Sequence, residues 1–250
     1  MRIIISPAKK MNCNTDLFGW QELPQFTDRS QSLMEYIKTL TCEQCRAIWK
    51  CNDKIAEQNF ARFLEMDLMR GLTPAILAYE GIQYQYMAPA VMETSALDYL
   101  QKHLRILSGF YGILKPFDGI VPYRLEMQAR LGGQTVDSLY EFWGSLLAET
   151  LFQEDSFILN LASKEYSRCV SDHLQPGIRF VTCVFGEEMN GKVVEKGTFA
   201  KMARGEMVRF LAENQVEDVA GICRFNHLGY RFCEAGSEEG RLLFLKAQED

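Results

Sequence analysis

The order of apolar and polar residues along the chain predicts a protein built from both strands and helices. Short continuous apolar runs that are rich in branched residues predict buried strands. An Asn-Gly pair between two such runs predicts a tight hairpin turn, because both residues tolerate a positive φ. We therefore expect buried strands at 3–5 and 157–162, a short strand at 74–79, a hairpin of 179–185 and 192–199 joined through Asn190-Gly191, and a second hairpin of 230–233 and 242–245 with its turn at 236–240.

Elsewhere, apolar positions that recur every three to four residues predict amphipathic helices. Two helices are expected within 28–70. The second begins at Thr41, where Gln44 completes the pattern of a capping box, and a break is expected near Asn52. Further helices are expected at 94–107, with Thr94 or Ser95 as the cap, at 138–152 and at 200–214, and a loop rich in glycine and proline is expected at 109–123.

This mixture of helices and hairpins, without strict alternation of strand and helix, favours the α+β class, here a mixed α/β architecture. We expect a mixed sheet with hairpins, surrounded by helices, in one domain over residues 1–250, because the chain has no repeat and no clear linker. An apolar share of 47% can fill a complete core. The sequence has no long apolar run and no secretion signal, so we expect a cytoplasmic protein without a membrane span.

The end of the first strand is a candidate binding site. Proline at position 7 stops the strand, because its ring removes a backbone donor and fixes φ. Ser6 and Lys9 are thereby placed at the end of a central strand, where such folds commonly build binding sites. The alternative is a strand that ends in a plain turn, with a solvated lysine.

The segment 104–116 is a second candidate, because a helical pattern is followed by Gly109 and Gly112 and then by an apolar stretch. Backbone amides near glycines can approach a phosphate closely, as in a helix–hairpin–helix element that grips DNA. The match is loose, since two residues separate the glycines. A glycine that simply ends a helix is the alternative.

Two further segments carry charge in a pattern. In an extended 122–127 segment, Arg124 and Glu126 point to one face, where they can hold an anion or form an ion pair. On a helix over 201–210, Lys201, Arg204 and Arg209 share one broad face. We expect Lys201 and Arg204 in the first turn, where cations oppose the helix dipole and a bound anion would explain them. A solvated basic face is the alternative.

The eight cysteines are expected to be reduced thiols in a chain without a secretion signal. Cys42 and Cys45 have the Cys-x-x-Cys spacing, with Cys51 nearby, but the set of ligands for a metal is incomplete. We therefore expect no metal and no cofactor, and we interpret the spacing as coincidence. A peroxide-responsive dithiol is the alternative.

Taken together, six segments resemble the signature blocks of the YaaA family of bacterial peroxide stress proteins. Their order and spacing fit over essentially the whole chain. The resemblance departs at Gly81, where Glu80 stands in place of a basic residue and Ile82-Gln83 replace an acid and a hydrophobe. The six segments are 5–9, 104–112, 122–127, 140–144, 160–166 and 201–205.

The resemblance implies a protein that helps cells survive hydrogen peroxide by limiting free intracellular iron. It also implies a mixed α/β fold with a positively charged cleft, a helix–hairpin–helix element and affinity for duplex or distorted DNA. By the same resemblance, Glu126 and Glu165 are candidates for acid–base chemistry. The candidate DNA- or anion-binding residues are Ser6, Lys9, Arg105, Ser108, Gly109, Tyr111, Gly112, Arg124, Asn160, Ser163, Lys201, Arg204 and Arg209.

Two functions remain open at this point. The first is a nonenzymatic protein that binds DNA through phosphate contacts with little sequence preference. The second is an enzyme that acts on a small anionic or phosphorylated substrate. The net charge of −6 argues against broad attraction to nucleic acid but is compatible with a local basic cleft. A groove as wide as a duplex would favour DNA, whereas a closed pocket of a few hundred Å³ would favour a small ligand.

Overall fold

The first strand, β1 (Arg2–Ile5), lies in the middle of a mixed sheet, between two parallel neighbours. Its three isoleucines are fully buried, as expected of a parallel strand that is covered on both faces. The computed structural model describes residues 1–13, 17–132 and 137–247. In sheet order the strands are β11 (Tyr230–Phe232), β12 (Arg241–Lys246), β9 (Arg179–Met189), β8 (Phe157–Asn160), β1, β5 (Leu104–Ser108) and β6 (Gly112–Leu114), and β10 (Lys192–Val194) pairs with β9.

Parallel pairing runs from β5 through β1, β8 and β9 to β12, and antiparallel hairpins add the remaining strands. Both predicted hairpins are present, because β9 pairs with β10 and β11 pairs with β12 in antiparallel register. The mixed α/β class is therefore confirmed.

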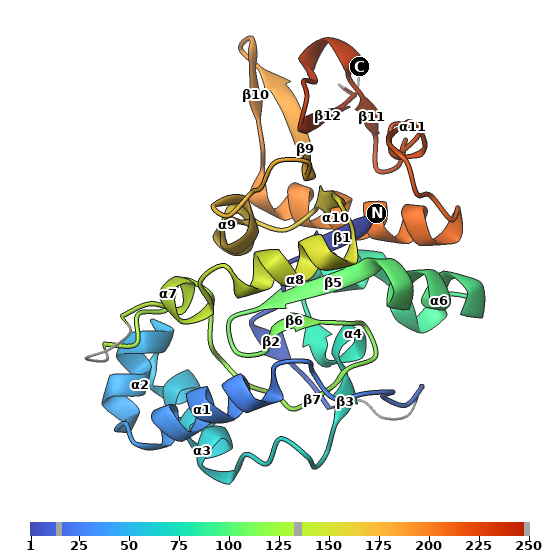
Figure 1. Ribbon diagram of the computed structural model, residues 1–250. Coiled ribbons are helices and arrows are strands. Elements are labelled where there is room, and N and C mark those ends of the chain that lie inside the picture. Colours follow the sequence, from blue (N-terminus) through green and yellow to red (C-terminus); the bar gives the residue numbers. More distant parts are fainter. Residues whose placement is uncertain (14–16, 133–136, 248–250) are drawn as a thin grey trace.

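Helices surround the sheet, and the first three group together at the lower left of Figure 1. The strands β9 to β12 lie at the opposite end, at the top of the same view. Among the described residues, none of the helices combines the length and the apolar composition that a membrane-spanning helix needs. The helices are α1 (Thr27–Lys38), α2 (Cys42–Trp49), α3 (Asp53–Glu65), α4 (Ala75–Ala78), α5 (Ile82–Met87), α6 (Thr94–His103), α7 (Leu139–Trp143), α8 (Leu146–Glu154), α9 (Lys164–Ser171), α10 (Gly197–Glu213) and α11 (Val219–Ile222), with 3₁₀ turns η1 (Pro89–Val91) and η2 (Glu234–Gly236).

Local capping signals in the sequence predicted where α2 and α3 begin. Thr41 and Gln44 form the reciprocal bonds of a capping box at the start of α2, with N···O distances of 3.2 and 2.8 Å. The expected break at Asn52 is the boundary between α2 and α3, because the Asn52 side chain accepts from the N–H of Ile55 and caps the new helix. The next helix begins at Thr94 as expected, but Glu93 occupies the cap position in place of Thr94 or Ser95.

The helix–hairpin–helix-like element is absent from segment 104–116, and this expectation is wrong. The helix ends at His103, and 104–108 forms β5, which turns at 109–111 into the antiparallel strand β6. All five residues of β5 are buried, because the strand lies between β1 and β6. The glycines have packing roles: a Cβ on Gly109 would lie 2.6 Å from the carbonyl oxygen of Leu125, and Gly112 has a φ of +75°.

Three other boundaries differ from expectation. The predicted strand 74–79 is instead the one-turn helix α4 between two short strands, β3 (Thr73–Pro74) and β4 (Tyr79–Glu80). These pair with β7 (Gly119–Ile120) and β2 (Lys10–Met11). The helix expected at 138–152 is divided into α7 and α8 at Gly144, whose φ is +50°. The strand expected at 192–199 ends at Val194, because α10 already begins at Gly197.

Candidate functional site

A pocket of about 410 Å³ opens at the carboxyl end of β1. Its walls come from the loop after β1, the start of α5, the segment 123–126, the start of α9 and one face of α10. Eight residues that were singled out from the sequence line it: Ser6, Lys9, Arg124, Glu126, Ser163, Glu165, Lys201 and Arg204.

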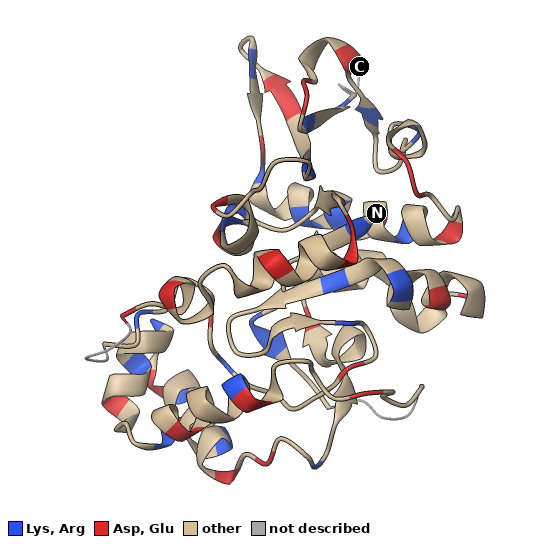
Figure 2. Cartoon of the chain, in the orientation of Figure 1, with Lys and Arg blue, Asp and Glu red and all other residues tan. Residues whose placement is uncertain are grey.

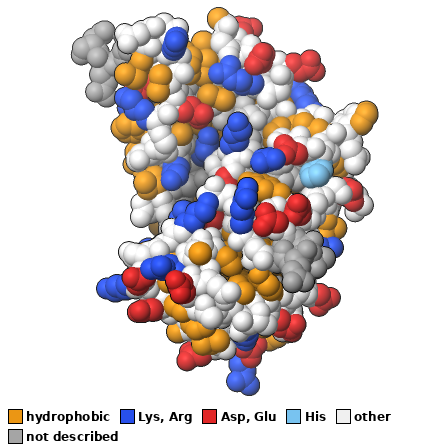
Figure 3. All heavy atoms as spheres, turned by 90° about the vertical axis from the view of Figure 1, so that its left-hand side faces the viewer, with side chains coloured by type: hydrophobic (Ala, Val, Ile, Leu, Met, Phe, Trp, Pro, Cys, Tyr) orange, Lys and Arg blue, Asp and Glu red, His pale blue; other side chains and the backbone are white. Residues whose placement is uncertain are grey.

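The pocket is locally basic although the protein is acidic. Acidic and basic residues are interspersed over most elements in Figure 2. In the space-filling view, however, Lys and Arg side chains gather across the middle of one face (Figure 3). Five Lys and Arg side chains and three Glu side chains line the pocket, which leaves an excess of two positive charges when all are ionised.

Ser6 ties together the elements that form the pocket. Its hydroxyl donates to the hydroxyl of Ser163 at 3.1 Å and accepts from the backbone N–H of Ser163 at 2.8 Å. Its carbonyl oxygen accepts from the hydroxyl of Tyr84 at 3.0 Å. Since Ser163 precedes α9 and Tyr84 belongs to α5, the end of β1 is fixed between these two helices.

Lys9, Arg124 and Glu126 form one ionic cluster in the pocket. The Nζ atom of Lys9 lies 2.7 Å from one carboxylate oxygen of Glu126, and Nη2 of Arg124 lies 3.2 Å from the other. Arg124 is largely buried, and among the described residues its Nε–H has no hydrogen-bond partner. Glu126 is thus neutralised from both sides by groups that also face the pocket.

Glu165, in the first turn of α9, is the second candidate carboxylate. Burial raises its pKa above the ordinary value, and the backbone N–H that Gln128 donates at 3.3 Å only partly compensates. No ion pair to Glu165 is found within the described residues. A carboxyl group with a raised pKa can exchange protons closer to neutral pH.

Lys201 and Arg204 reach the pocket from α10. The side chain of Arg204 is only 16% exposed; its Nη2 lies 3.3 Å from Glu195, and burial lowers its pKa from the ordinary value. Gly205 makes this position possible, because a Cβ there would lie 2.1 Å from the carbonyl oxygen of Gln83. Since α10 begins at Gly197, Lys201 lies in its second turn, so the expected opposition to the helix dipole in the first turn is wrong.

Comparison with known proteins identifies the family. A family model described as "Peroxide stress protein YaaA" matches residues 1–236. The chain belongs to the YaaA family of peroxide stress proteins. It is 53% identical to a UPF0246 protein of Lachnoclostridium phytofermentans, over 100% of this chain and 98% of the relative. It is also 51% identical to a UPF0246 protein of Desulfitobacterium hafniense, over 100% of both chains, and 48% identical to one from Pediococcus pentosaceus, over 98% of both chains.

The segments that resemble YaaA signature blocks fall into two groups in space. Four of them, at 5–9, 122–127, 160–166 and 201–205, contribute residues to the pocket. The other two, at 104–112 and 140–144, pack behind it, where Nε1 of Trp143 donates to the carbonyl oxygen of Gly109 at 3.0 Å. Part of the YaaA-like pattern therefore builds the core that supports the pocket.

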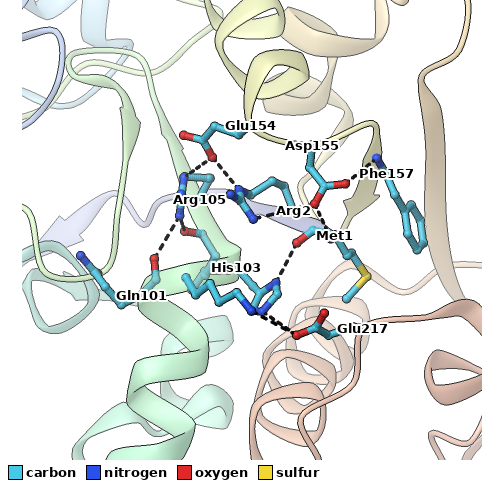
Figure 4. Close-up of polar contacts among 11 residues, drawn as sticks. Met1, Arg2, Gln101, His103, Arg105, Glu154, Asp155, Phe157 and Glu217 are labelled. Atoms are coloured by element: carbon cyan, nitrogen blue, oxygen red, sulfur yellow. Dashed lines mark hydrogen bonds and ion pairs between the residues drawn. The ribbon is translucent and has the colours of Figure 1, made fainter.

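Seven of the residues singled out from the sequence lie outside the pocket. Arg105 is buried and shares Glu154 with Arg2, at 2.8 and 2.6 Å (Figure 4). It also borders a separate hollow of about 200 Å³. The other six are Ser108, hydrogen-bonded to Tyr123; Gly109 and Gly112, in the β5–β6 turn region; Tyr111, which accepts a hydrogen bond from the N–H of Val121; Asn160, hydrogen-bonded to Thr182; and Arg209, which forms an ion pair with Glu213.

Sequence reasoning missed Gln83 and Tyr84, which line the pocket from α5. Gln83 is 7% exposed, and its side-chain Nε2 has no hydrogen-bond partner in the described part of the chain. The available signal was Gly81, because a Cβ at this position would lie 2.9 Å from the Cβ of Ala8 in the loop after β1. A glycine at such a close approach indicates that the start of α5 packs against the site.

The cysteines are free thiols. Cys45 is buried, and this burial raises its pKa to about 11, so the thiol is protonated at neutral pH. Within the described residues, no group of three or more His, Cys, Asp or Glu is arranged to hold a metal ion. The geometry at Cys45 therefore does not favour a reactive dithiol with Cys42.

Proposed function

We propose that the protein acts in the peroxide stress response by binding phosphate groups of DNA at the pocket beside β1. The observation that carries this proposal is the convergence of Lys9, Arg124, Lys201 and Arg204 on one hollow from three separate segments. Cations that converge on one pocket are typical of phosphate contacts, and such contacts fix position without reading sequence. Family membership supports the peroxide setting. A cytoplasmic location and a lowering of free intracellular iron belong to the same proposal.

The DNA contact in this proposal is narrower than the one expected from the sequence. With no helix–hairpin–helix element in segment 104–116, the glycine amides of 109–112 are not part of it. A hollow of about 410 Å³ is also too small for a duplex. We therefore infer that the duplex backbone lies across the basic face of Figure 3 and that only a strand or a nucleotide enters the pocket.

Salt dependence of binding tests the proposal. Each neutralised phosphate contributes about −0.9 to the slope of log affinity against log salt. Two contacts, by Lys201 and Arg204, predict a slope of about −2, and contacts by all four of the cations named above predict about −4. Fluorescence anisotropy with linear, bulged and junction DNA measures this slope. Lys201→Ala should reduce it by about 1, whereas Lys54→Ala, which removes an exposed lysine of α3 outside the pocket, should not. A slope near zero contradicts the proposal.

The pocket volume favours a second candidate, an enzyme that acts on a small anionic or phosphorylated substrate. A volume of about 410 Å³ lies in the range of small-ligand sites. In this case Lys201 and Arg204 bind the anion and Glu165, with its raised pKa, serves as the general base. Turnover of a phosphorylated compound that is lost in Glu165→Gln, while binding of the compound persists, would support this candidate over pure DNA binding.

A further inference from the structure

The pocket has two chemically different ends, and Ser6 lies between them. On one side, the Ser6 carbonyl contacts Tyr84 of α5, which packs against α10 through Gly205. On the other side, the Ser6 hydroxyl contacts Ser163 at the start of α9. We call the first the cationic end, formed by Gln83, Lys201 and Arg204, and the second the carboxylate end, formed by Glu126 and Glu165 with Lys9 and Arg124.

The cationic end offers hydrogen-bond donors without acceptors. Among the described residues no carboxylate pairs with Lys201. Arg204 meets Glu195 only through Nη2, and its buried Nε–H lacks a partner in the same part of the chain. The buried amide of Gln83 likewise leaves its N–H₂ group unbonded. The ammonium of Lys201 and these unmet donors suit a group that is rich in acceptors, and a phosphate monoester has three such oxygens and a phosphodiester two.

At the carboxylate end, hydrogen-bond acceptors of the described residues are left without donors. The charge of Glu126 is already balanced by Lys9 and Arg124. Glu165 accepts one weak backbone bond, at 3.3 Å from the nitrogen of Gln128, and retains free acceptor positions. A phosphate at this end would face two carboxylates, so the phosphate of a bound ligand belongs at the cationic end. A ligand group that presents hydrogen-bond donors belongs beside Glu165.

We propose that the pocket holds one nucleotide, with its phosphate at the cationic end and the Watson–Crick edge of its base at Glu165. This inference rests on the proposed function, that the pocket takes phosphate-bearing ligands, and it names the ligand class. Guanine is the expected base, because its adjacent N1–H and N2–H₂ donors match the two oxygens of one carboxylate. Thymine presents one N–H flanked by two carbonyl oxygens, which Glu165 repels.

A nucleotide whose Watson–Crick edge contacts Glu165 cannot be base-paired, because pairing uses the same edge of the base. If the nucleotide belongs to DNA, it must come from a single strand or be extruded from a distorted duplex. A free mononucleotide supplies the same chemistry. The two sources are therefore distinguished by experiment.

Isothermal titration of the full chain tests the proposal with four probes: deoxyguanosine 5′-monophosphate, thymidine 5′-monophosphate, deoxyguanosine and inorganic phosphate. We expect the guanine nucleotide to bind about tenfold more tightly than the thymine nucleotide, and deoxyguanosine without phosphate to lose about tenfold. Lys201→Ala should weaken binding of the guanine nucleotide as much as removal of the phosphate does. Glu165→Gln should abolish the preference for guanine, and Lys54→Ala should change neither the affinity nor the preference. The ratio between the two nucleotides on the unaltered protein needs no variant, so it is measurable even if Glu165→Gln does not fold.

The same measurements on oligothymidine strands with and without one central guanine test the DNA source. Equal affinity for the guanine and thymine mononucleotides overturns the proposal. So does an absence of mononucleotide binding while bulged DNA still binds in a Lys201-dependent way, although the proposed DNA function then stands. Guanine nucleotide binding in the predicted order, without any DNA binding, supports the nucleotide pocket and rejects DNA as its source.

Discussion

The buried carboxyl of Asp118 makes a prediction about stability that is independent of ligand binding. Asp118 is 3% exposed and lies just before β7, where one oxygen accepts the N–H of Lys115 at 2.9 Å. The other oxygen, Oδ1, is buried without a hydrogen-bond partner in the described residues. Burial raises the pKa of Asp118 from 3.8 to about 7. We therefore expect Asp118→Asn to stabilise the protein at neutral pH.

The size and sign of this effect follow from proton binding. Between about pH 4 and pH 7, the folded protein retains a proton on Asp118 that the unfolded chain has lost, so the free energy of unfolding falls as the pH rises through this range. A change of this size in pKa corresponds to up to about 4 kcal/mol at full ionisation. Asparagine keeps an acceptor for Lys115 and removes the charge. The stability advantage of the variant should be small at pH 4 and grow to between about 1 and 4 kcal/mol at pH 7.5.

Urea unfolding followed by circular dichroism, at intervals from about pH 4 to pH 8, measures this difference directly. Other carboxyl groups titrate in both proteins, so the difference between variant and parent isolates Asp118. Asp67→Asn is the matched control, because Asp67 also accepts a backbone N–H in a turn but its side chain is 50% exposed. A difference that is constant with pH, or one that the control reproduces, would refute the reasoning.

Two further predictions concern packing and thiol chemistry. Gly205→Ala should destabilise the protein by roughly 1 to 3 kcal/mol, because the added Cβ would lie 2.1 Å from the Gln83 carbonyl oxygen. Gly197→Ala is the control and should leave stability unchanged, because no atom lies within 4 Å of the added Cβ. Thermal unfolding of both variants measures the difference, and equal melting temperatures would contradict the prediction. In the folded protein at pH 8, iodoacetamide should label the exposed Cys13 but not Cys45, and a peroxide pulse should leave this pattern unchanged. Mass spectrometry of the labelled peptides measures the labelling. If peroxide treatment prevents labelling of Cys42 and Cys45 after the protein is unfolded, the dithiol hypothesis is restored.

The sequence predicted those parts of the fold that depend on local signals. The capping box at Thr41, the break at Asn52 and the hairpin turn at Asn190-Gly191 each arise from residues within a few positions of one another. The branched run before Pro7 likewise identified the central strand. These features form because short-range hydrogen bonds and steric limits decide them.

The segment 104–108 shows where such signals fail. Its apolar spacing continues the helix before it, but pairing with β1, about a hundred residues earlier in the chain, makes it a strand. The same distance explains Arg105, which is basic in sequence yet is buried against Glu154 of α8. Long-range pairing of this kind leaves no periodic trace in the segment itself.

The sequence predicted the cations of the candidate site but not the shape of the pocket. Lys9, Arg124, Lys201 and Arg204 were chosen by residue type and resemblance, and the structure brings them to one pocket. Gln83 was missed, since its importance depends on the close packing of α5 against α10. The two-ended arrangement of donors and acceptors likewise emerges only when the segments are placed in space.

Lysine footprinting tests most directly whether phosphate groups bind at the end of β1. The protein is acetylated with and without a bulged oligonucleotide, and mass spectrometry gives the modification of each lysine. We predict that DNA protects Lys9 and Lys201 and leaves Lys54 and Lys192, which lie outside the pocket, as reactive as before. Protection of Lys54 or Lys192 with Lys9 and Lys201 still fully reactive would contradict the account.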